Sequence, residues 1–318
     1  MTVGVEEISD EGLGSRSNER FVEAAVGAAR GLAERDPEMA RWTAPLVRAI
    51  KRRRLRLPSL SPTVHRVVKL IESQEVDLDE LADAVSGDPV LATRIMGVAN
   101  SSYFRGATEV PNVRDALMRM GVREARTIVI VVALRATVMR SPGLGDMASV
   151  LWKHSLLAAS ATQEITAELP PWETAGFLAG LVHDLGKLVV LAFAAELPAW
   201  QDDGAEPGSA VVEAMMAATH AELGAMVLAS WAFPEPFCEA VLLHHDASQA
   251  VGDAGSLAIA VEVGNRIASQ IEQGWPEDAA ELDETLVERA TRLGVDPPRL
   301  SDIAMEAETN FEALSKLG

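Results

Sequence analysis

Apolar residues recur at helical spacing along most of this chain. From residue 21 to 51 the pattern (Phe21, Ala24, Ala25, Ala28, then Leu46 and Ile50) predicts one or two helices. Ser61 followed by Pro62 is a good N-cap and first-turn pair for the next helix, and Asp88-Pro89 has the same role further on. The same periodicity predicts helices over 78–85, 115–120, 124–139, 148–167, 172–193, 210–232, 236–245, 257–270, 284–293 and 300–317.

Two stretches need a decision between local structures. Ile128–Val132 is β-branched throughout, but it lies inside a longer helical pattern, so we expect a buried helix. Asn100-Ser101-Ser102 predicts a helix end and a turn, with the asparagine tolerating a left-handed backbone. Contact of Asn100 with a ligand or partner is the alternative. The chain shows no internal repeat and no βαβ alternation, which predicts an all-α helical bundle with a helical upstream lobe.

Composition narrows the class of protein. The chain has 318 residues, of which 48% are hydrophobic and 4% aromatic, and its formal net charge is −19. That charge opposes binding to nucleic acid or to an anionic membrane. The strongest apolar runs, Ile128–Leu134 and Leu188–Ala195, are too short to span a bilayer. With no secretory pattern at the start and a single cysteine, Cys238, expected to be a buried and inert thiol, we predict a soluble cytoplasmic protein.

Three segments follow from these patterns. Residues 1–56 form a polar arm (1–20) and a helical segment, residues 57–270 form the main domain, and residues 271–318 form an acidic helical segment. The apolar face of this last segment is expected to pack on the domain or on a second subunit of a homo-oligomer. The cationic run Lys51–Arg56 is interpreted as a solvated helix end, because no aromatic residues are interleaved as in a nucleic-acid patch.

Candidate chemistry is concentrated in the histidines. Five of the six fall between residues 154 and 245, and they include the doublets His183-Asp184 and His244-His245. Adjacent helical residues point about 100° apart, so each doublet can serve one pocket only near a helix end or across two metal positions. Imidazoles with a carboxylate suit a divalent Fe, Mn or Zn ion, which activates a bound water. Lys187, one turn after His183, could then neutralise a phosphate; the alternative is that each histidine is a satisfied core or interface group.

The order of the motifs resembles a known family. The segment GFLAGLVHDLGKLVV (176–190) resembles the central motif of the HD superfamily of metal-dependent phosphohydrolases. More specifically, several stretches resemble the HD-related output domain (HDOD) family, and together they cover about residues 57–270: Leu57-Pro58-Ser59-Leu60, Gly87-Asp88-Pro89-Val90-Leu91, Val98 to Phe104, Val113 to Ala116 leading to Met120-Gly121, and HAELGAMVLASWAFPEPFCEAVLLHH (220–245).

This resemblance implies a bacterial signalling module that acts mainly through protein–protein interaction, with a partly retained HD-type metal site. The residues at the ligand positions are His154, His183, Asp184, His220, His244 and His245. The final aspartate of the pattern is replaced by Asn265, a weaker ligand, although Glu262 one turn earlier could substitute.

A hydrolytic function is the alternative reading of the same motifs. It would be a metal-dependent phosphohydrolase acting on a nucleotide or cyclic dinucleotide, with Asp184 as ligand or proton acceptor and Lys187 holding a phosphate. The HD-GYP branch, which cleaves cyclic dinucleotides, is disfavoured because His244-His245 is followed by Asp246-Ala247-Ser248 where a Gly-Tyr-Pro element is expected.

Overall fold

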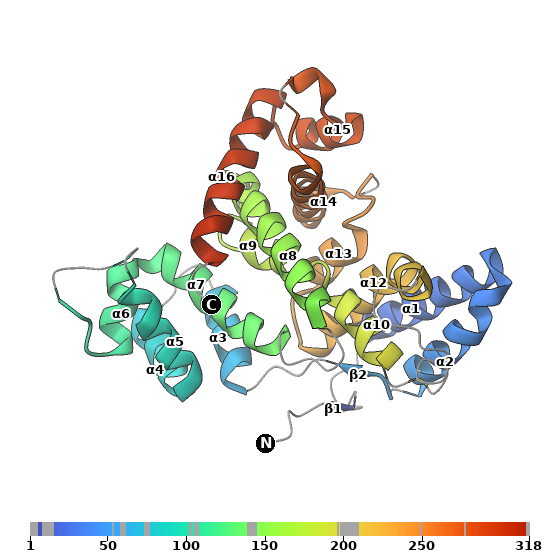
Figure 1. Cartoon of the computed structure of the whole chain (residues 1–318), viewed down its shortest axis with the longest axis horizontal. Coiled ribbons are helices and arrows are strands. Elements are labelled where there is room, and N and C mark those ends of the chain that lie inside the picture. Colours follow the sequence, from blue (N-terminus) through green and yellow to red (C-terminus); the bar gives the residue numbers. More distant parts are fainter. Residues whose placement is uncertain are drawn as a thin grey trace. The chain divides into compact units, whose positions relative to one another are not determined.

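The fold is all-α, as the sequence pattern predicts (Figure 1). The computed structural model describes residues 6–7, 16–52, 54–57, 62–72, 77–101, 104, 108–138, 145–195, 197, 210–248, 250–276 and 278–315. Within these residues the strands are limited to one antiparallel pair of two-residue segments, β1 (Glu6–Glu7) and β2 (Arg56–Leu57). The chain divides into two compact units, residues 1–59 with 139–308, and residues 60–138 with 309–318.

The first unit contains the helices that carry the histidine motifs. Its helices are α1 (Arg16–Arg35), α2 (Ala40–Lys51), α8 (Gly145–Thr166), α9 (Gly176–Val182), α10 (Leu185–Ala195), α12 (Ala210–Ser230), α13 (Glu235–Leu243), α14 (Gly252–Gln273), α15 (Glu284–Arg292) and the start of α16 (Pro297–Ser315). Short 3₁₀ turns, η1 (Pro37–Met39) and η2 (Ala279–Glu281), precede α2 and α15.

Two helices, α12 and α14, make most of the helix–helix contacts in the first unit. Helix α14 packs against α8, α9 and α13, and α12 packs against α1, α10 and α13 (Figure 1). Helix α1 contributes a buried stripe at positions 21, 25, 29 and 32, the spacing expected of one helix face. Helix α12 is buried along most of its length, and few of its residues are polar.

The second unit is a smaller set of helices. It contains α3 (Pro62–Glu72), α4 (Leu78–Ser86), α5 (Pro89–Ala99), α6 (Val113–Met120), α7 (Val122–Val138) and the last residues of α16. The β-branched run Ile128–Val132 lies in α7 and is fully buried, which confirms the helical prediction. Asp88 caps α5 by accepting hydrogen bonds from the Val90 and Leu91 backbone amides, as predicted.

Asn100 differs from its prediction in one respect. It is the C-cap of α5, but its φ of −95° places it outside the left-handed region. Its side-chain oxygen instead accepts a hydrogen bond from the Val110 backbone amide at 3.0 Å, which ties the following loop to the helix end. Asn100 therefore has a local structural role, and the left-handed geometry is not needed for it.

Two other expectations change with the structure. The helix predicted over 172–193 is interrupted, because α9 ends at Val182 and α10 begins at Leu185. Part of the predicted polar arm is ordered, since Glu6–Glu7 forms β1. Several sequence predictions lie outside the described residues: the Pro58–Ser61 portion of the upstream motif, Arg53 of the cationic run, and Ser102-Tyr103.

By length and composition alone, two helical stretches of the described residues are long and apolar enough to cross a membrane, and one of them extends beyond the short apolar run Leu188–Ala195. They are Gly176–Ala195 and Ala210–Ser230, and their most apolar windows are 83% and 67% buried inside the protein. Such burial is typical of core helices. Cys238 is also buried, and burial raises the pKa of its thiol to about 12, as expected for an inert cysteine.

Candidate metal centre

All six histidine and aspartate residues singled out by the sequence converge in the first unit. His154 lies in α8, the pair His183-Asp184 forms the turn between α9 and α10, and His220 lies in the middle of α12. His244 and His245 follow the last residue of α13. Both doublets thus sit at helix ends, which is the condition that adjacent residues need to reach one pocket.

Close helix contacts fix the spacing of these residues. A Cβ added at Gly186 would lie 1.9 Å from the backbone oxygen of His220, so α10 and α12 touch through backbone at this point. On the other side, a Cβ added at Gly264 of α14 would lie 2.1 Å from the Thr162 hydroxyl of α8. Glycine is required at both positions for the helices to approach so closely.

Asp184 stands between two groups of histidines. Its Oδ2 lies 3.4 Å from His183 Nε2 and 3.7 Å from His154 Nε2. Its Oδ1 lies 3.4 Å from His220 Nε2 and 3.7 Å from His244 Nε2. The ligand atoms of His154, His183 and Asp184 lie within 4.8 Å of one another, and so do those of His220, His244 and His245. One carboxylate therefore faces two potential ion positions.

The backbone fixes which nitrogen of each central histidine faces the pocket. The Nδ1 atoms of His183, His220 and His244 lie 2.7, 2.6 and 2.6 Å from the carbonyl oxygens of residues 180, 216 and 241. A carbonyl only accepts, so each Nδ1 carries the proton and donates it. In the neutral ring each Nε2 then presents a lone pair to the pocket, as in metal-ligating histidines generally.

The three nitrogens of the second group crowd one point. His220 Nε2 lies 3.1 Å from His244 Nε2 and 2.8 Å from His245 Nε2. Burial lowers the pKa of His220 to about 4, and burial also lowers the pKa of His244 and His245. All three rings are therefore neutral near pH 7. Because Nδ1 carries the proton in both rings, neutral His220 and His244 bring two Nε2 lone pairs together, which repel unless a cation lies between them. Neutral His245 can instead donate from its Nε2 to His220.

Unpaired atoms in the other group also fit a metal ion. Within the described residues, His183 Nε2 and Asp184 Oδ1 are buried and have no hydrogen-bond partner. Burial favours the neutral acid, but the neighbouring His183, Lys187 and His244 outweigh it and hold the pKa of Asp184 well below its usual value. A buried carboxylate that stays ionised beside imidazole nitrogens suits a divalent cation.

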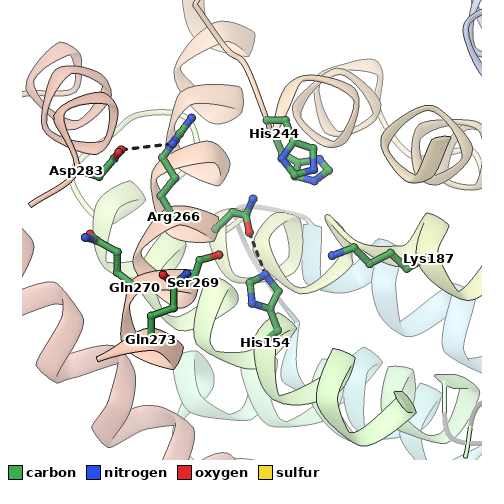
Figure 2. A pocket seen from close by; sticks show the side chains of 10 residues that line it. His154, Lys187, His244, Arg266, Ser269, Gln270, Gln273 and Asp283 are labelled. Atoms are coloured by element: carbon green, nitrogen blue, oxygen red, sulfur yellow. Dashed lines mark hydrogen bonds and ion pairs between the residues drawn. The ribbon is translucent and has the colours of Figure 1, made fainter. Parts of the chain in front are cut away.

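His154 is held differently. Its Nδ1 lies 3.0 Å from Glu272 Oε2. Its Nε2 lies 2.9 Å from Asn265 Oδ1, the contact that the dashed line at His154 marks in Figure 2. Burial lowers the pKa of His154, but the hydrogen bond to Glu272 and the charges of Asp184 and Glu272 outweigh burial, so the pKa is raised. A metal ion at His154 Nε2 would therefore compete with a proton.

Glu272 was missed at the level of sequence. It lies seven residues after Asn265 on α14, two turns along the same helix face, and this spacing is the signal that could have identified it. Glu262, considered there as a substitute ligand, has other partners. Its buried carboxylate accepts from the Ala247 backbone amide at 2.8 Å and from Arg266 and Arg289 at 3.1 Å each.

The centre opens into a polar cavity of about 430 Å³ in which His154, His244 and His245 face Lys187 and Arg266 (Figure 2). Lys187 Nζ lies 2.5 Å from Asp184 Oδ2, so this cation pairs with the carboxylate that faces both groups. Arg266 pairs with Glu262 and with Asp283, which also lines the cavity. Ser269, Gln270 and Gln273 of α14 form another, uncharged wall.

The HDOD domain family model matches residues 57–247, which is more than half of the chain. The chain belongs to the HDOD domain family. An uncharacterised protein of Treponema pallidum (strain Nichols) is 24% identical over 230 residues. That match covers 68% of this chain but only 43% of the relative, so the chain spans less than half the length of the curated relative that it matches.

Solved structures show the same fold. An HDOD domain protein of unknown function from Geobacter sulfurreducens has a TM-score of 0.63 and 23% identity, covering 82% of this chain and 93% of its own. A candidate metal-dependent phosphohydrolase from Shewanella amazonensis SB2B has a TM-score of 0.60 and 21% identity, covering 87% and 98%. A candidate signal transduction protein from Marinobacter aquaeolei VT8 has a TM-score of 0.63 and 18% identity, covering 99% and 66%.

Proposed function

We propose that this chain is a bacterial, cytoplasmic HDOD regulatory protein that binds a divalent metal ion in its histidine centre and acts through a protein partner. The metal assignment rests on three imidazole nitrogens that lie close together. His220 Nε2 is 3.1 Å from His244 Nε2 and 2.8 Å from His245 Nε2. The orphaned Asp184 Oδ1 beside them supports it. A cation between the Nε2 lone pairs of neutral His220 and His244 would remove their repulsion, and the nitrogen-rich set favours Zn, Fe or Mn.

Two sets of residues would hold metal. One is His154, His183 and Asp184, and the other is His220, His244 and His245. When bound, a divalent ion supplies Lewis acidity and lowers the pKa of a coordinated water. The backbone carbonyls on the Nδ1 atoms orient the rings, and Glu272 orients His154.

Three contacts favour regulation over hydrolysis. Asn265 is uncharged and meets His154, the site where a carboxylate would add negative charge. Glu262 is committed to Arg266 and Arg289. Lys187 already pairs with Asp184, which reduces the charge available to an ion. With so little negative charge available, the site binds a divalent ion less tightly than a carboxylate-rich one, which supports a regulatory role over a permanently loaded catalytic centre.

A metal-dependent phosphohydrolase acting on a nucleotide or cyclic dinucleotide is the second candidate. The cavity of about 430 Å³ favours it, because that volume lies within the range of small-molecule sites and places Lys187 and Arg266 beside the histidines. Lys187 would then exchange its pairing with Asp184 for a phosphate oxygen. Turnover therefore separates the two candidates.

Both candidate functions assume that the histidine centre binds a divalent metal ion, and the metal content of the purified protein tests this directly. Protein purified without chelator should contain at least about half an equivalent of Zn, Fe or Mn by elemental analysis. His183→Ala should lose most of it, because Nε2 of His183 is buried in the centre. His65→Ala is the matched control, since His65 lies in the second unit, and it should retain the metal. Metal-free wild-type protein after reconstitution with all three ions would refute the assignment.

Partner binding and turnover decide between regulation and hydrolysis. We expect affinity capture from the source cells to recover a defined partner with the wild-type chain and with Lys187→Ala. We expect no turnover of a panel of nucleotides and cyclic dinucleotides supplied with Zn, Fe or Mn. Turnover that Lys187→Ala abolishes while metal content is unchanged would establish the hydrolase instead.

A further inference from the structure

Helix α15 contacts the turn that follows His244-His245. This helix lies outside residues 57–247, the part of the chain that the HDOD family model matches. The described residues 246–248 and 250 come directly after His244-His245 at the end of α13, and they are called the 246–250 turn below. Arg292, the last residue of α15, donates hydrogen bonds to three backbone carbonyls of this turn, those of Ala247 at 3.3 Å, Ser248 at 3.1 Å and Ala250 at 2.9 Å. The planar guanidinium group carries several N–H donors, so one arginine can donate hydrogen bonds to several carbonyl groups of a turn.

A second arginine of α15 holds the same turn through a buried carboxylate. Arg289 donates to Glu262 at 3.1 Å, and the same Glu262 oxygen accepts the backbone amide of Ala247 at 2.8 Å. Arg289 also lies 3.4 Å from Asp246 Oδ1. Glu262 is fully buried, so its charge is compensated by Arg289 and Arg266. Hydrogen bonds therefore hold both a backbone amide and several backbone carbonyls of this turn.

His245 is the ligand whose position depends most on this turn. His183, His220 and His244 are each anchored by an Nδ1 hydrogen bond to their own helix backbone, and His154 by Glu272. Among the described residues, no such anchor is present for Nδ1 of His245, and its Nε2 is the closest contact of His220 Nε2 at 2.8 Å. The backbone that follows His245 therefore has to supply the positioning that the other rings receive locally.

We propose that α15 positions the second half of the metal centre, with Arg292 holding the 246–250 turn so that His245 stays beside His220 and His244. The inference rests on the proposed metal binding and extends it to a segment outside the family match. Arg292 acts through the turn and contacts no ligand atom, so it is a positioning residue. Ion binding by His220, His244 and His245 should depend on it, whereas binding by His154, His183 and Asp184 should not.

Titration of apo protein with Co²⁺, followed by its visible absorption, tests this dependence. Wild-type protein, Arg292→Ala and His245→Ala are compared, and His245→Ala identifies the part of the Co²⁺ signal that the second group produces. We expect Arg292→Ala to weaken that part about 10-fold, the lower end of the loss seen when outer contacts of metal ligands are removed. The remaining Co²⁺ signal should keep its affinity and its spectrum.

Arg299→Ala is the matched control, because Arg299 lies on α16 of the same segment and pairs only with exposed Glu306 among the contacts seen here. It should leave all Co²⁺ binding unchanged. Thermal unfolding checks that each variant is folded, and Arg292→Gln, which keeps one amide donor group, replaces Arg292→Ala if the latter is unfolded. Arg292→Gln should then show a smaller loss of the same part of the signal.

The outcomes separate the two proposals. Unchanged Co²⁺ binding in a folded Arg292 variant, or equal weakening of every part of the signal, would overturn the positioning role and leave the metal proposal standing. Wild-type protein that takes up no Co²⁺ would overturn the metal proposal and, with it, the inference built on it.

Discussion

Asn265 determines how much negative charge the centre can offer to an ion. Its side-chain oxygen lies 2.9 Å from His154 Nε2, so the residue meets the centre directly. Asp184 is the one carboxylate among the candidate ligands, and Lys187 partly neutralises it. A charge added at position 265 would therefore act on the ion where compensation is weakest.

The substitution Asn265→Asp should increase metal affinity about 10-fold, because a carboxylate is a stronger ligand than an amide and adds a charge. Isothermal titration with Zn²⁺ measures the change. Gln270→Glu adds a charge on the same helix but farther along the cavity wall, and it should change the affinity less. Equal affinities for wild type and Asn265→Asp would show that residue 265 does not reach the ion.

Ala232 adopts a backbone conformation that favours glycine. Its φ is +58°, and it follows the end of α12. The Phe233 amide donates to Leu228 O and the Ala232 amide to Ala229 O, which is the Schellman pattern of helix termination. The Cβ of alanine is strained in this region, whereas glycine is not.

Ala232→Gly should therefore stabilise the protein by about 1 kcal/mol. The same change at Ala24, inside α1, should destabilise it by about 1 kcal/mol, because glycine is a poor helix former. Chemical denaturation of the two variants measures both signs. Destabilisation by both substitutions would contradict the strained geometry at residue 232.

At the scale of elements, close backbone contact sets the geometry of the centre. Gly186 of α10 lies against the His220 backbone of α12, and the two helices carry Asp184 and His220 at this crossing. Any side chain at residue 186 has to separate the helices. The spacing between the shared carboxylate and the second group of histidines therefore depends on one glycine.

Gly186→Ala should destabilise the protein by about 1–3 kcal/mol and weaken metal binding, since the overpacked crossing has to open. Gly27→Ala in α1, where an added Cβ meets nothing within 4 Å, should be neutral or stabilising by up to about 1 kcal/mol. Thermal unfolding and Zn²⁺ titration measure the two effects. Full metal affinity in Gly186→Ala would show that the crossing does not control the site.

Helix periodicity predicts the elements well but not their interruptions. The helices over 78–85 and 124–139 were predicted within a few residues of α4 and α7, because one buried face repeats along each. The break between α9 and α10 was missed because apolar residues continue through both helices. The break is what lets adjacent His183 and Asp184 face the same centre, so tertiary packing overrides the local pattern.

The same limit applies to the site. The spacing of the histidines indicates that they share a pocket, but it does not show that Asp184 lies between two groups. Glu272 of α14 contacts His154, and Arg292 of α15 contacts the turn after His245, so both roles depend on the tertiary fold. Glu262 has an acidic side chain at a plausible position, but it pairs with Arg266 on the same helix and with Arg289 of α15.

At the scale of the whole molecule, the candidate ligands connect several helices of the first unit. They come from α8, the α9–α10 turn, α12 and the end of α13. An ion bound to the folded chain but not to the unfolded chain should therefore stabilise this unit by about 2.7 kcal/mol at a free concentration of 100 Kd.

Thermal unfolding of the apo protein with and without Zn²⁺ measures that stabilisation. The midpoint should rise with Zn²⁺ and return when a chelator is added. His183→Ala should show little rise, whereas His65→Ala should behave as wild type. A midpoint that Zn²⁺ leaves unchanged in the wild-type protein would argue against a site that links these helices.

X-ray absorption at the zinc edge of the Zn²⁺-loaded protein tests the central claim most directly, because it reports the atoms bound to the ion. The account predicts a first shell dominated by imidazole nitrogen at about 2.0–2.1 Å, with the outer-ring scattering of several histidines. His245→Ala should reduce the imidazole contribution. A shell of oxygen atoms alone, without imidazole scattering, would contradict the assignment of the histidine centre as the metal site.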